Sequence, residues 1–333
     1  FISPNSITKI EKANILRNFE YEYKLNELYE NNDAFVSYHR DNFGLRSKCK
    51  NNKDIEILTV GGSTTDQRYV KLESTYQSIL ENHISNLIKR KFCISNAGVD
   101  GHTTFGHIYS FNNWFPLIPD LKPKYVILYI GINDADFLRI GANKGYDIND
   151  NTTIKGLLLN LYIFKKIMPL VRYIQTNLFR DKSKYANHLK FSFEDNDYTI
   201  TELNPNTKKL SELNAKLFEE RLKIILQQIN LMESQHICIT QPHIFVQKKL
   251  NNKKGIPNVF GENYSGLDFD YSLNSLNEKM KKLCGKYFID INYEKFKKSY
   301  FYDGVHTTEI GSEFLGNLIY EKLQLKGLLD IFQ

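Results

Sequence analysis

The feature that most constrains the fold is a series of five short apolar segments, separated by longer amphipathic stretches. These segments are IEILTV (55–60), FCISN (92–96), KYVILYIGIND (124–134), HICIT (236–240) and YFIDI (287–291). The third is apolar without interruption over YVILYIGI, which is typical of a strand buried on both faces of a parallel sheet. We therefore predict that each segment is a buried β-strand.

Amphipathic helices are predicted in the stretches between these strands. The predicted helices are 74–91, 207–234, 271–284 and 308–323. Strands that alternate with helices indicate β-α-β units, so we expect a three-layer α/β/α sandwich around a mostly parallel five-stranded sheet. The helix over 207–234 is expected to turn one apolar stripe toward the core, formed by Leu210, Leu213, Leu217 and Ile224.

Two regions do not follow this alternation. Residues 1–53 are polar and irregular, apart from a helix-like stretch at 12–30, and are predicted to be an N-terminal extension. Residues 54–333 are expected to form the α/β domain, with a helical insertion at about 137–205 that breaks or kinks near Pro169. Because loops at strand ends vary while a scaffold is kept, this insertion is expected to select the substrate.

Composition excludes some classes of protein. With 41% hydrophobic and 25% charged residues, the 333-residue chain is typical of a globular protein and not of a disordered one. The net charge of +6 comes from lysines scattered among Asn and Glu, without a basic stripe. We therefore expect no nucleic-acid partner, although a mildly basic surface could attract an acidic glycan or an anionic lipid.

Four cysteines, Cys49, Cys93, Cys238 and Cys284, lie far apart and form no Cys-x-x-Cys pair, so zinc-site spacing is absent. Cys93 and Cys238 lie in apolar runs, where we expect free thiols that act as small core residues. No apolar run reaches the length of a membrane span. Because the chain starts at Phe1, any membrane association is expected to need a segment upstream, and both bacterial cytoplasm and cell envelope stay open.

Polar residues follow four of the five predicted strands. Ser63 follows the first within GGST, Gly101 follows the second within VDGHTT, and Asn133 ends the third within GIND. Asp303 and His306 come after the fifth, within DGVH. Each motif alone has a structural explanation as a glycine turn, an Asx-turn or a helix cap. Because ligands bind outside the carboxyl ends of parallel strands, we expect these residues to meet at one edge of the sheet.

These segments resemble the SGNH hydrolases, the GDSL-type esterase and lipase superfamily, which is named for Ser, Gly, Asn and His in separate blocks. GGST stands where the family usually has Gly-Asp-Ser, and the other three segments match its glycine, Gly-x-Asn-Asp and Asp-x-x-His blocks. The resemblance spans roughly 55–323 and implies a flavodoxin-like SGNH fold. Gly62 occupies the family's aspartate position, and this Gly-Gly-Ser-Thr variant is similar to that of bacterial enzymes of surface-glycan modification.

The chemistry explains the residue types. A serine hydroxyl is a weak nucleophile and needs a base, and His306 can take the proton of Ser63 and return it to the leaving alcohol. Asp303, three residues before, can accept the other imidazole N–H and stabilise the imidazolium. The resemblance assigns the oxyanion hole to the backbone N–H groups of Ser63 and Gly101 and to the side-chain amide of Asn133. It implies no metal and no organic cofactor.

Two residues that follow strand ends, Arg68 and His243, are the candidates for substrate contact. Asp290, at the end of the fifth strand, is the alternative to Asp303 as the acid of the triad, and Asp303 is preferred.

Several neighbouring polar residues are expected to be structural. Asp134 should brace the loop of Asn133, and Thr64 with Thr65 should cap the helix after the nucleophile turn. His102 and His107, with Asp100, lack a further ligand and are not expected to bind a metal.

The principal hypothesis is a serine ester hydrolase that removes O-acyl groups, O-acetyl above all, from a carbohydrate or bacterial surface glycan. It would work through an acyl-Ser63 intermediate on a small-molecule or glycan ester. The alternative is an O-acyltransferase that uses the same triad to acylate a sugar hydroxyl. The two enzymes would differ in how well water is excluded from the acyl-enzyme. A third hypothesis is a catalytically silent glycan-binding module, which would not need both a nucleophile and its base.

Overall fold

The computed structural model describes residues 13–25, 28, 35–135, 193–249, 252–259, 264–291 and 295–332. Its centre is a parallel sheet of five strands in the order β4-β3-β5-β6-β9. The strands are β3 (Ile57–Gly61), β4 (Ile94–Asn96), β5 (Tyr125–Tyr129), β6 (Gln235–Ile239) and β9 (Phe288–Ile289). In chain order this arrangement is 2-1-3-4-5, the flavodoxin-like order, which confirms the predicted fold class.

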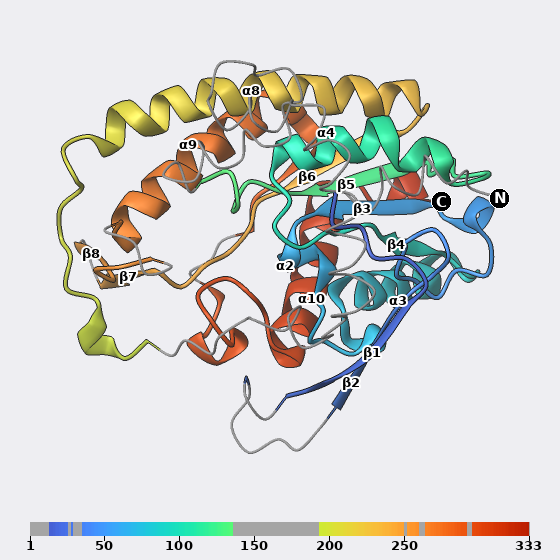
Figure 1. Cartoon of the computed structure of the whole chain (residues 1–333), viewed down its shortest axis with the longest axis horizontal. Coiled ribbons are helices and arrows are strands. Elements are labelled where there is room, and N and C mark those ends of the chain that lie inside the picture. Colours follow the sequence, from blue (N-terminus) through green and yellow to red (C-terminus); the bar gives the residue numbers. More distant parts are fainter. Residues whose placement is uncertain are drawn as a thin grey trace, which may run out of the picture.

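Helices cover both faces of this sheet (Figure 1). One face carries α4 (Thr104–Asn113), α8 (Thr207–Leu231) and α9 (Gly266–Cys284), and the other carries α3 (Tyr76–Ile88) and α10 (Glu309–Leu325). The strand side chains alternate between the faces: Val126 and Leu128 of β5 pack with the first set, whereas Ile127 and Tyr129 pack with the second. A strand buried on both faces must be apolar at every position, which explains the uninterrupted YVILY run.

The inward face of α8 differs from the predicted leucine stripe. Leu210, Leu213 and Ile224 are 39%, 57% and 40% exposed, so this prediction was wrong for three of its four residues. The buried face of α8 instead consists of Thr207, Ser211, Asn214, Ala215, Phe218, Arg221, Leu222, Ile225 and Ile229. Some of its polar residues have partners inside the protein: Asn214 Nδ2 donates to the carbonyl oxygen of Asp134 at 2.6 Å, and Thr207 Oγ1 donates to Asp268 Oδ1 at 2.6 Å.

The helix predicted at 12–30 is also wrong. Part of that stretch is β1 (Phe19–Lys24), which pairs antiparallel with β2 (Phe35–Arg40). The sequence FEYEYK alternates with a period of two, and its partner FVSYHR buries every second residue. That period belongs to a strand with one buried face, and the buried Tyr23, Val36 and Tyr38 form a small core of their own.

A second antiparallel hairpin is formed by β7 (Val246–Lys249) and β8 (Asn252–Gly255). One further short helix, α2 (Ser63–Asp66), follows β3 directly. The 3₁₀ turns are η1 (Asn52–Asp54), η2 (Leu72–Ser74), η3 (Phe115–Leu117), η7 (Asp195–Asp197), η8 (Gly285–Tyr287), η10 (Lys298–Tyr300) and η11 (Asp330–Phe332).

Most of the predicted insertion at 137–205, including Pro169, lies outside the described residues, so its helicity and its role in substrate selection stay predictions. Its last part is described: it contains η7, and Ile200 forms an antiparallel bridge with Gly255 at the end of β8. Among the described residues, none of the helices combines the length and apolar character that a bilayer crossing needs.

The prediction of free thiols was wrong. Cys49 forms a disulfide with Cys93, and Cys238 forms one with Cys284. The first joins the segment after the N-terminal hairpin to the start of β4, and the second joins β6 to the end of α9. Sequence spacing hid both pairs because their members lie 44 and 46 residues apart and meet only through the packing of the sheet.

Candidate active site

The turn after β3 presents Ser63 at the carboxyl edge of the sheet. Gly62 is the N-cap of α2, and Ser63 is the first residue of that helix and half-buried. A Cβ atom on Gly62 would lie 2.5 Å from Asn133 Nδ2 and 3.2 Å from the carbonyl oxygen of His102. Because real Cβ atoms do not approach so closely, a glycine at position 62 is what allows the Asn133 amide to sit against the serine turn.

Ser63, His306 and Asp303 form one continuous chain of hydrogen bonds. His306 Nε2 lies 2.6 Å from Ser63 Oγ, and His306 Nδ1 lies 2.6 Å from Asp303 Oδ2. With the Nδ1–H donated to the carboxylate, Nε2 is the acceptor for the serine hydroxyl. Asp303 Oδ1 accepts two backbone N–H groups, from Val305 at 2.8 Å and from His306 at 2.7 Å, so the turn itself orients the carboxylate.

Charge and burial act in opposite directions on this pair. Burial by itself lowers the pKa of His306, but the charge and hydrogen bond of Asp303 outweigh it and hold that pKa above its ordinary value. Burial by itself raises the pKa of Asp303, but the charge and hydrogen bond of His306 and two backbone N–H groups hold it below. The arrangement therefore stabilises an imidazolium next to an ionised carboxylate, the state that a general base reaches after it takes a proton.

The imidazole plane is held by an aromatic neighbour. Tyr302 stacks on His306, with ring centroids 5.5 Å apart and planes 8° from parallel. Tyr69 packs edge-on against the ring of Tyr302, with ring centroids 5.9 Å apart. A pocket of about 10 Å³ lies against Ser63 and His306, with Tyr69 and Tyr302 in its lining. A pocket of this size has room for about one water molecule.

Gly101 and Asn133 lie on the two loops that flank the serine turn. Gly101 is exposed and has φ +73°, a backbone conformation that favours glycine, and a Cβ there would meet no atom within 4 Å. Asn133 Nδ2 donates to the carbonyl oxygen of His102 at 2.9 Å, which ties the loop after β5 to the loop of Gly101.

Asp134 braces this region, as the sequence predicts. Its buried carboxylate accepts the backbone N–H of Thr104 at 3.0 Å and the Thr104 hydroxyl at 2.6 Å, at the first residue of α4. Arg221 Nη2 of α8 lies 3.4 Å from the same carboxylate. Asp134 therefore supplies the capping contact that the N-cap residue Thr103 does not make.

Two buried glutamines that sequence reasoning missed connect the loops of the site. Gln67 Nε2 donates to Thr307 Oγ1 at 3.0 Å and to Ser312 Oγ at 2.7 Å, which links the serine helix to α10. Gln241 Nε2 donates to Thr64 Oγ1 at 2.6 Å, and its Oε1 accepts the backbone N–H of Ile132 at 2.7 Å. The available signal for Gln241 was its place directly after the fourth strand.

Arg68 and His243, the two candidates for substrate contact, are both buried and ion-paired. Arg68 is 7% exposed and forms ion pairs with Asp66 and Asp100. His243 is 2% exposed, and its Nε2 lies 3.4 Å from Asp270 Oδ1. Carboxylates hold both side chains inside the protein, and their contact with a substrate stays a prediction.

The remaining candidates also have structural partners. Asp290 is exposed and accepts from Thr240 Oγ1 at 3.1 Å, while Asp303 holds His306. His102 is buried and donates through Nε2 to the carbonyl oxygen of Ala13, and burial lowers its pKa to about 4.

The predicted capping role of Thr64 and Thr65 was wrong. Gly62 is the N-cap of α2, no side-chain hydrogen bond caps that helix, and both threonines lie inside it. Thr65 Oγ1 donates instead to the carbonyl oxygen of Tyr129 at 3.3 Å, so it ties the helix to β5.

No protein-family model and no curated protein sequence matches this chain. Several solved structures are similar at low identity. Axe2, an acetylxylan esterase from Geobacillus stearothermophilus, is 14% identical with a TM-score of 0.44, covering 81% of this chain and 93% of its own. The acetyl xylan esterase AlAXEase is 13% identical with a TM-score of 0.43, covering 80% and 98%. EstA, an esterase from Pseudoalteromonas sp., is 10% identical with a TM-score of 0.42, covering 81% and 96%. Similarity at this level carries no information about activity or substrate.

Proposed function

We propose that this protein is a serine ester hydrolase that removes O-acyl groups, acetyl above all, from a carbohydrate such as a bacterial surface glycan. The observation that carries the proposal is the chain from Asp303 through His306 to Ser63, with both links at 2.6 Å. A structural turn has no need of a partly exposed serine hydroxyl bonded to an imidazole that a buried carboxylate orients.

In the proposed reaction, Ser63 Oγ attacks the ester carbonyl carbon while His306 Nε2 takes the hydroxyl proton. The tetrahedral intermediate then loses the alcohol as its C–O bond breaks, and His306 returns the proton to that alcohol. A water molecule attacks the acyl-Ser63 ester in the second half, again giving its proton to His306, and the carboxylic acid leaves as Ser63 regains its hydrogen. Asp303 keeps the imidazole in the correct tautomer throughout.

The negative charge on the intermediate needs donors, and three are proposed: the N–H groups of Ser63 and Gly101 and the amide of Asn133. Asn133 Nδ2 carries two hydrogens; one is donated to His102, and the second is assigned to the oxyanion. The glycan is proposed from the Gly-Gly-Ser-Thr variant.

The test is hydrolysis of p-nitrophenyl acetate by the protein beside Ser63→Ala, His306→Ala and a control, Ser37→Ala, which removes an exposed hydroxyl on β2. Nitrophenol release by the protein and the control only, with an acetyl adduct on Ser63 by mass spectrometry, is the expected result. Release that persists in Ser63→Ala, or none by the unaltered chain, contradicts the proposal. Acetylated oligosaccharides should then release acetate, whereas acetyl transfer to added sugar would identify an acyltransferase.

A further inference from the structure

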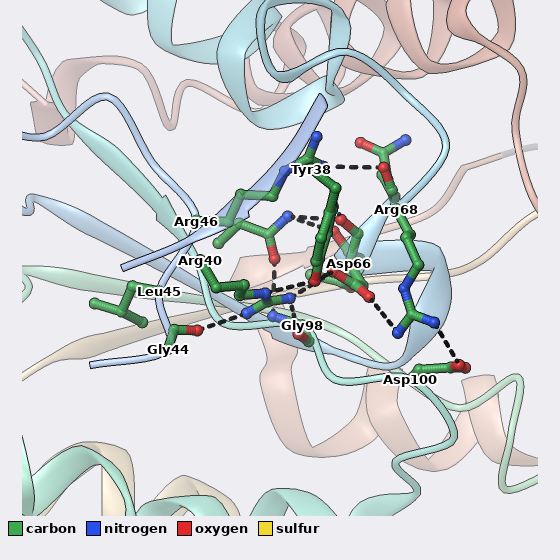
Figure 2. A network of polar contacts seen from close by, with 12 residues as sticks. Tyr38, Arg40, Gly44, Leu45, Arg46, Asp66, Arg68, Gly98 and Asp100 are labelled. Carbon is green, nitrogen blue, oxygen red and sulfur yellow. Dashed lines mark hydrogen bonds and ion pairs between the residues drawn. The ribbon is translucent and has the colours of Figure 1, made fainter. Parts of the chain in front are cut away.

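Asp66 is the last residue of α2 and lies three residues after Ser63. Its carboxylate is buried and contacts several charged and polar side chains. Its Oδ1 accepts from the Tyr38 hydroxyl at 2.6 Å and from Arg40 Nη2 at 2.5 Å, and Arg68 Nη2 lies 3.3 Å from Oδ2 (Figure 2). Tyr38 and Arg40 belong to the N-terminal hairpin, so a segment expected to be an extension reaches the helix of the nucleophile.

Both arginines that bind Asp66 also bind the loop that leads to Gly101. Arg40 Nη2 donates to the carbonyl oxygen of Gly98 at 2.5 Å, and Arg68 Nη1 lies 3.5 Å from Asp100 Oδ2. Figure 2 shows Arg68 between the two carboxylates, with one end of its guanidinium toward each. The planar guanidinium is suited to this because its donors are rigidly spaced. Asp66 and two arginines thus connect the helix of Ser63 to Gly98 and Asp100, just before Gly101.

A third arginine holds the backbone of the same turn. Arg46 donates to the carbonyl oxygens of Asp66 at 3.0 Å, Gln67 at 2.9 Å and Val70 at 2.7 Å. Burial by itself raises the pKa of Asp66, but the charges of Arg40 and Arg68 and the Tyr38 hydrogen bond outweigh it, so the pKa lies below its ordinary range. Asp66 is therefore an anion that holds cations in place.

Such a cluster is not explained by stability alone. Taking several charges out of water costs free energy that their attraction only partly returns, so buried ion networks are weak devices for stabilising a fold. Such networks fix the positions of their members, because a charged group that loses its partner remains buried without a counter-charge. Here the groups held in this way are the serine helix and the residues just before Gly101.

We propose that Arg68 is a positioning residue, which holds the Gly101 loop at its distance from Ser63 by bridging Asp66 and Asp100. Tyr38 and Arg40 anchor Asp66 from behind, so residues 38–46 of the N-terminal segment belong to the catalytic unit. The inference rests on the proposed function in one respect: the Gly101 N–H is taken as an oxyanion donor. Its mechanical part, the bridge itself, stands without that assignment.

The bridge also places charge near the base. Besides Asp303, which forms its hydrogen bond, and the stacked ring of Tyr302, the charged groups that act on His306 are Asp100 and Arg68: Asp100 raises its pKa and Arg68 lowers it. Removal of the Asp100 charge should therefore lower the pKa of His306. A change in the pH profile is something that a purely structural role would not produce.

The variants are chosen to keep the fold. Asp100→Asn changes a side chain that is 39% exposed, and Arg68→Lys keeps the positive charge but loses the fork that spans two carboxylates. The matched control is Glu56→Gln, which breaks another ion pair, with Arg90, at the amino end of β3 and away from the site. Thermal unfolding of all three checks that they are folded.

Two measurements on the full chain separate this inference from the proposed function. The first is hydrogen exchange of peptides covering 98–103, which should speed up in Asp100→Asn and Arg68→Lys but not in Glu56→Gln. The second is hydrolysis of p-nitrophenyl acetate, where kcat should fall about 10- to 100-fold with KM within about twofold. A 1 Å misplacement costs roughly 100-fold in rate, and a smaller displacement of the loop costs less. In Asp100→Asn the acid limb of the kcat profile should also move to lower pH.

The outcomes are distinct. Faster exchange with reduced kcat in both variants supports the bridge as a positioning device of an esterase. Faster exchange in a chain without esterase activity keeps the bridge and overturns the proposed function. Unchanged exchange and unchanged kcat in both variants contradict the positioning role of Arg68 but leave the proposed esterase activity standing. An equal loss of kcat and an equal rise in exchange in Glu56→Gln contradict that role as well.

Discussion

At the residue scale, the environment of His306 shows how neighbours decide chemistry. A buried imidazole without an anion would have a lowered pKa and would be a poor base. Asp303 reverses this effect by charge and by a hydrogen bond at 2.6 Å, and the tight Asp-x-x-His turn supplies the two backbone N–H groups that keep Asp303 ionised.

The first prediction concerns pH. The base must be neutral to accept the serine proton, so kcat should fall as pH drops through the pKa of His306, above the ordinary value of about 6.5. In Asp303→Asn, burial acts unopposed, so the pKa should fall and the acid limb should move to lower pH. kcat should drop about 10⁴-fold, the effect of a wrong tautomer in serine proteases. Full pH-rate profiles of both proteins test this; an unmoved acid limb contradicts it.

A second prediction at this scale concerns Gly62 and Asn133. Asn133→Ala should lower kcat about 10²- to 10³-fold by removing an oxyanion donor. Gly62→Ala should cause a similar loss, because its Cβ would lie 2.5 Å from Asn133 Nδ2 and displace that amide. The double variant should therefore be no worse than Asn133→Ala, and kcat values of the three proteins form the test. Losses that multiply would show that Gly62 acts independently of Asn133.

At the scale of elements, the period of the apolar residues predicts the type of element, but it does not by itself predict which side chains are buried. The helix over 207–234 was predicted from its apolar residues, but the structure buries Phe218 and exposes Leu213. In the stretch 12–30 the larger error was one of period, since FEYEYK alternates every two residues and forms a strand. The five central strands and four of the helices were predicted to within about five residues, because the strands are apolar and the helices amphipathic.

The third prediction tests which face of α8 is inside. Phe218→Ala should reduce the free energy of unfolding by about 3–5 kcal/mol, since a fully buried ring is lost. Leu213→Ala, on the same helix, should change it by no more than about 0.5 kcal/mol, because that side chain is 57% exposed. Urea unfolding followed by circular dichroism measures both. Equal destabilisation by the two substitutions would contradict the orientation of the helix.

At the scale of the whole molecule, the N-terminal segment is tied to the α/β domain by polar, apolar and covalent contacts. Arg40 and Arg46 bind the serine turn, Ala13 and Ile15 enter the main core, and Cys49 is bonded to Cys93. The second disulfide, Cys238–Cys284, joins the sheet to α9. Both close loops of similar length, which restricts the unfolded chain.

The fourth prediction follows from these bonds. Denatured protein that has not been reduced should show no reactive thiol, and the double substitution Cys49→Ser with Cys93→Ser should cost about 2–4 kcal/mol in free energy of unfolding. The corresponding pair of substitutions at Cys238 and Cys284 should cost a similar amount. Thiol titration and urea unfolding test this, and four titratable thiols in the unreduced chain would contradict both pairings.

The sequence by itself determined the class of fold and the residues that meet at the edge of the sheet. Uniformly apolar strands can only be buried between two layers, and parallel strands bring their carboxyl ends to one edge, so Ser63, Gly101, Asn133 and His306 were predictable as neighbours. The pairing of Asp303 with His306 was predictable as well, because three residues of a tight turn set it locally.

Only the tertiary structure decided which other side chains serve that edge. The contacts of Asp66 with Tyr38 and Arg40, the bridges made by Gln67 and Gln241, and both disulfides join residues that are distant in sequence. No local pattern records such contacts. Arg68 has the same sequence context whether it faces solvent or a carboxylate. Its second partner, Asp100, lies on the loop after β4, and only the packing of that loop against the serine helix brings the two together, because a buried charge must find its counter-charge wherever the fold brings one.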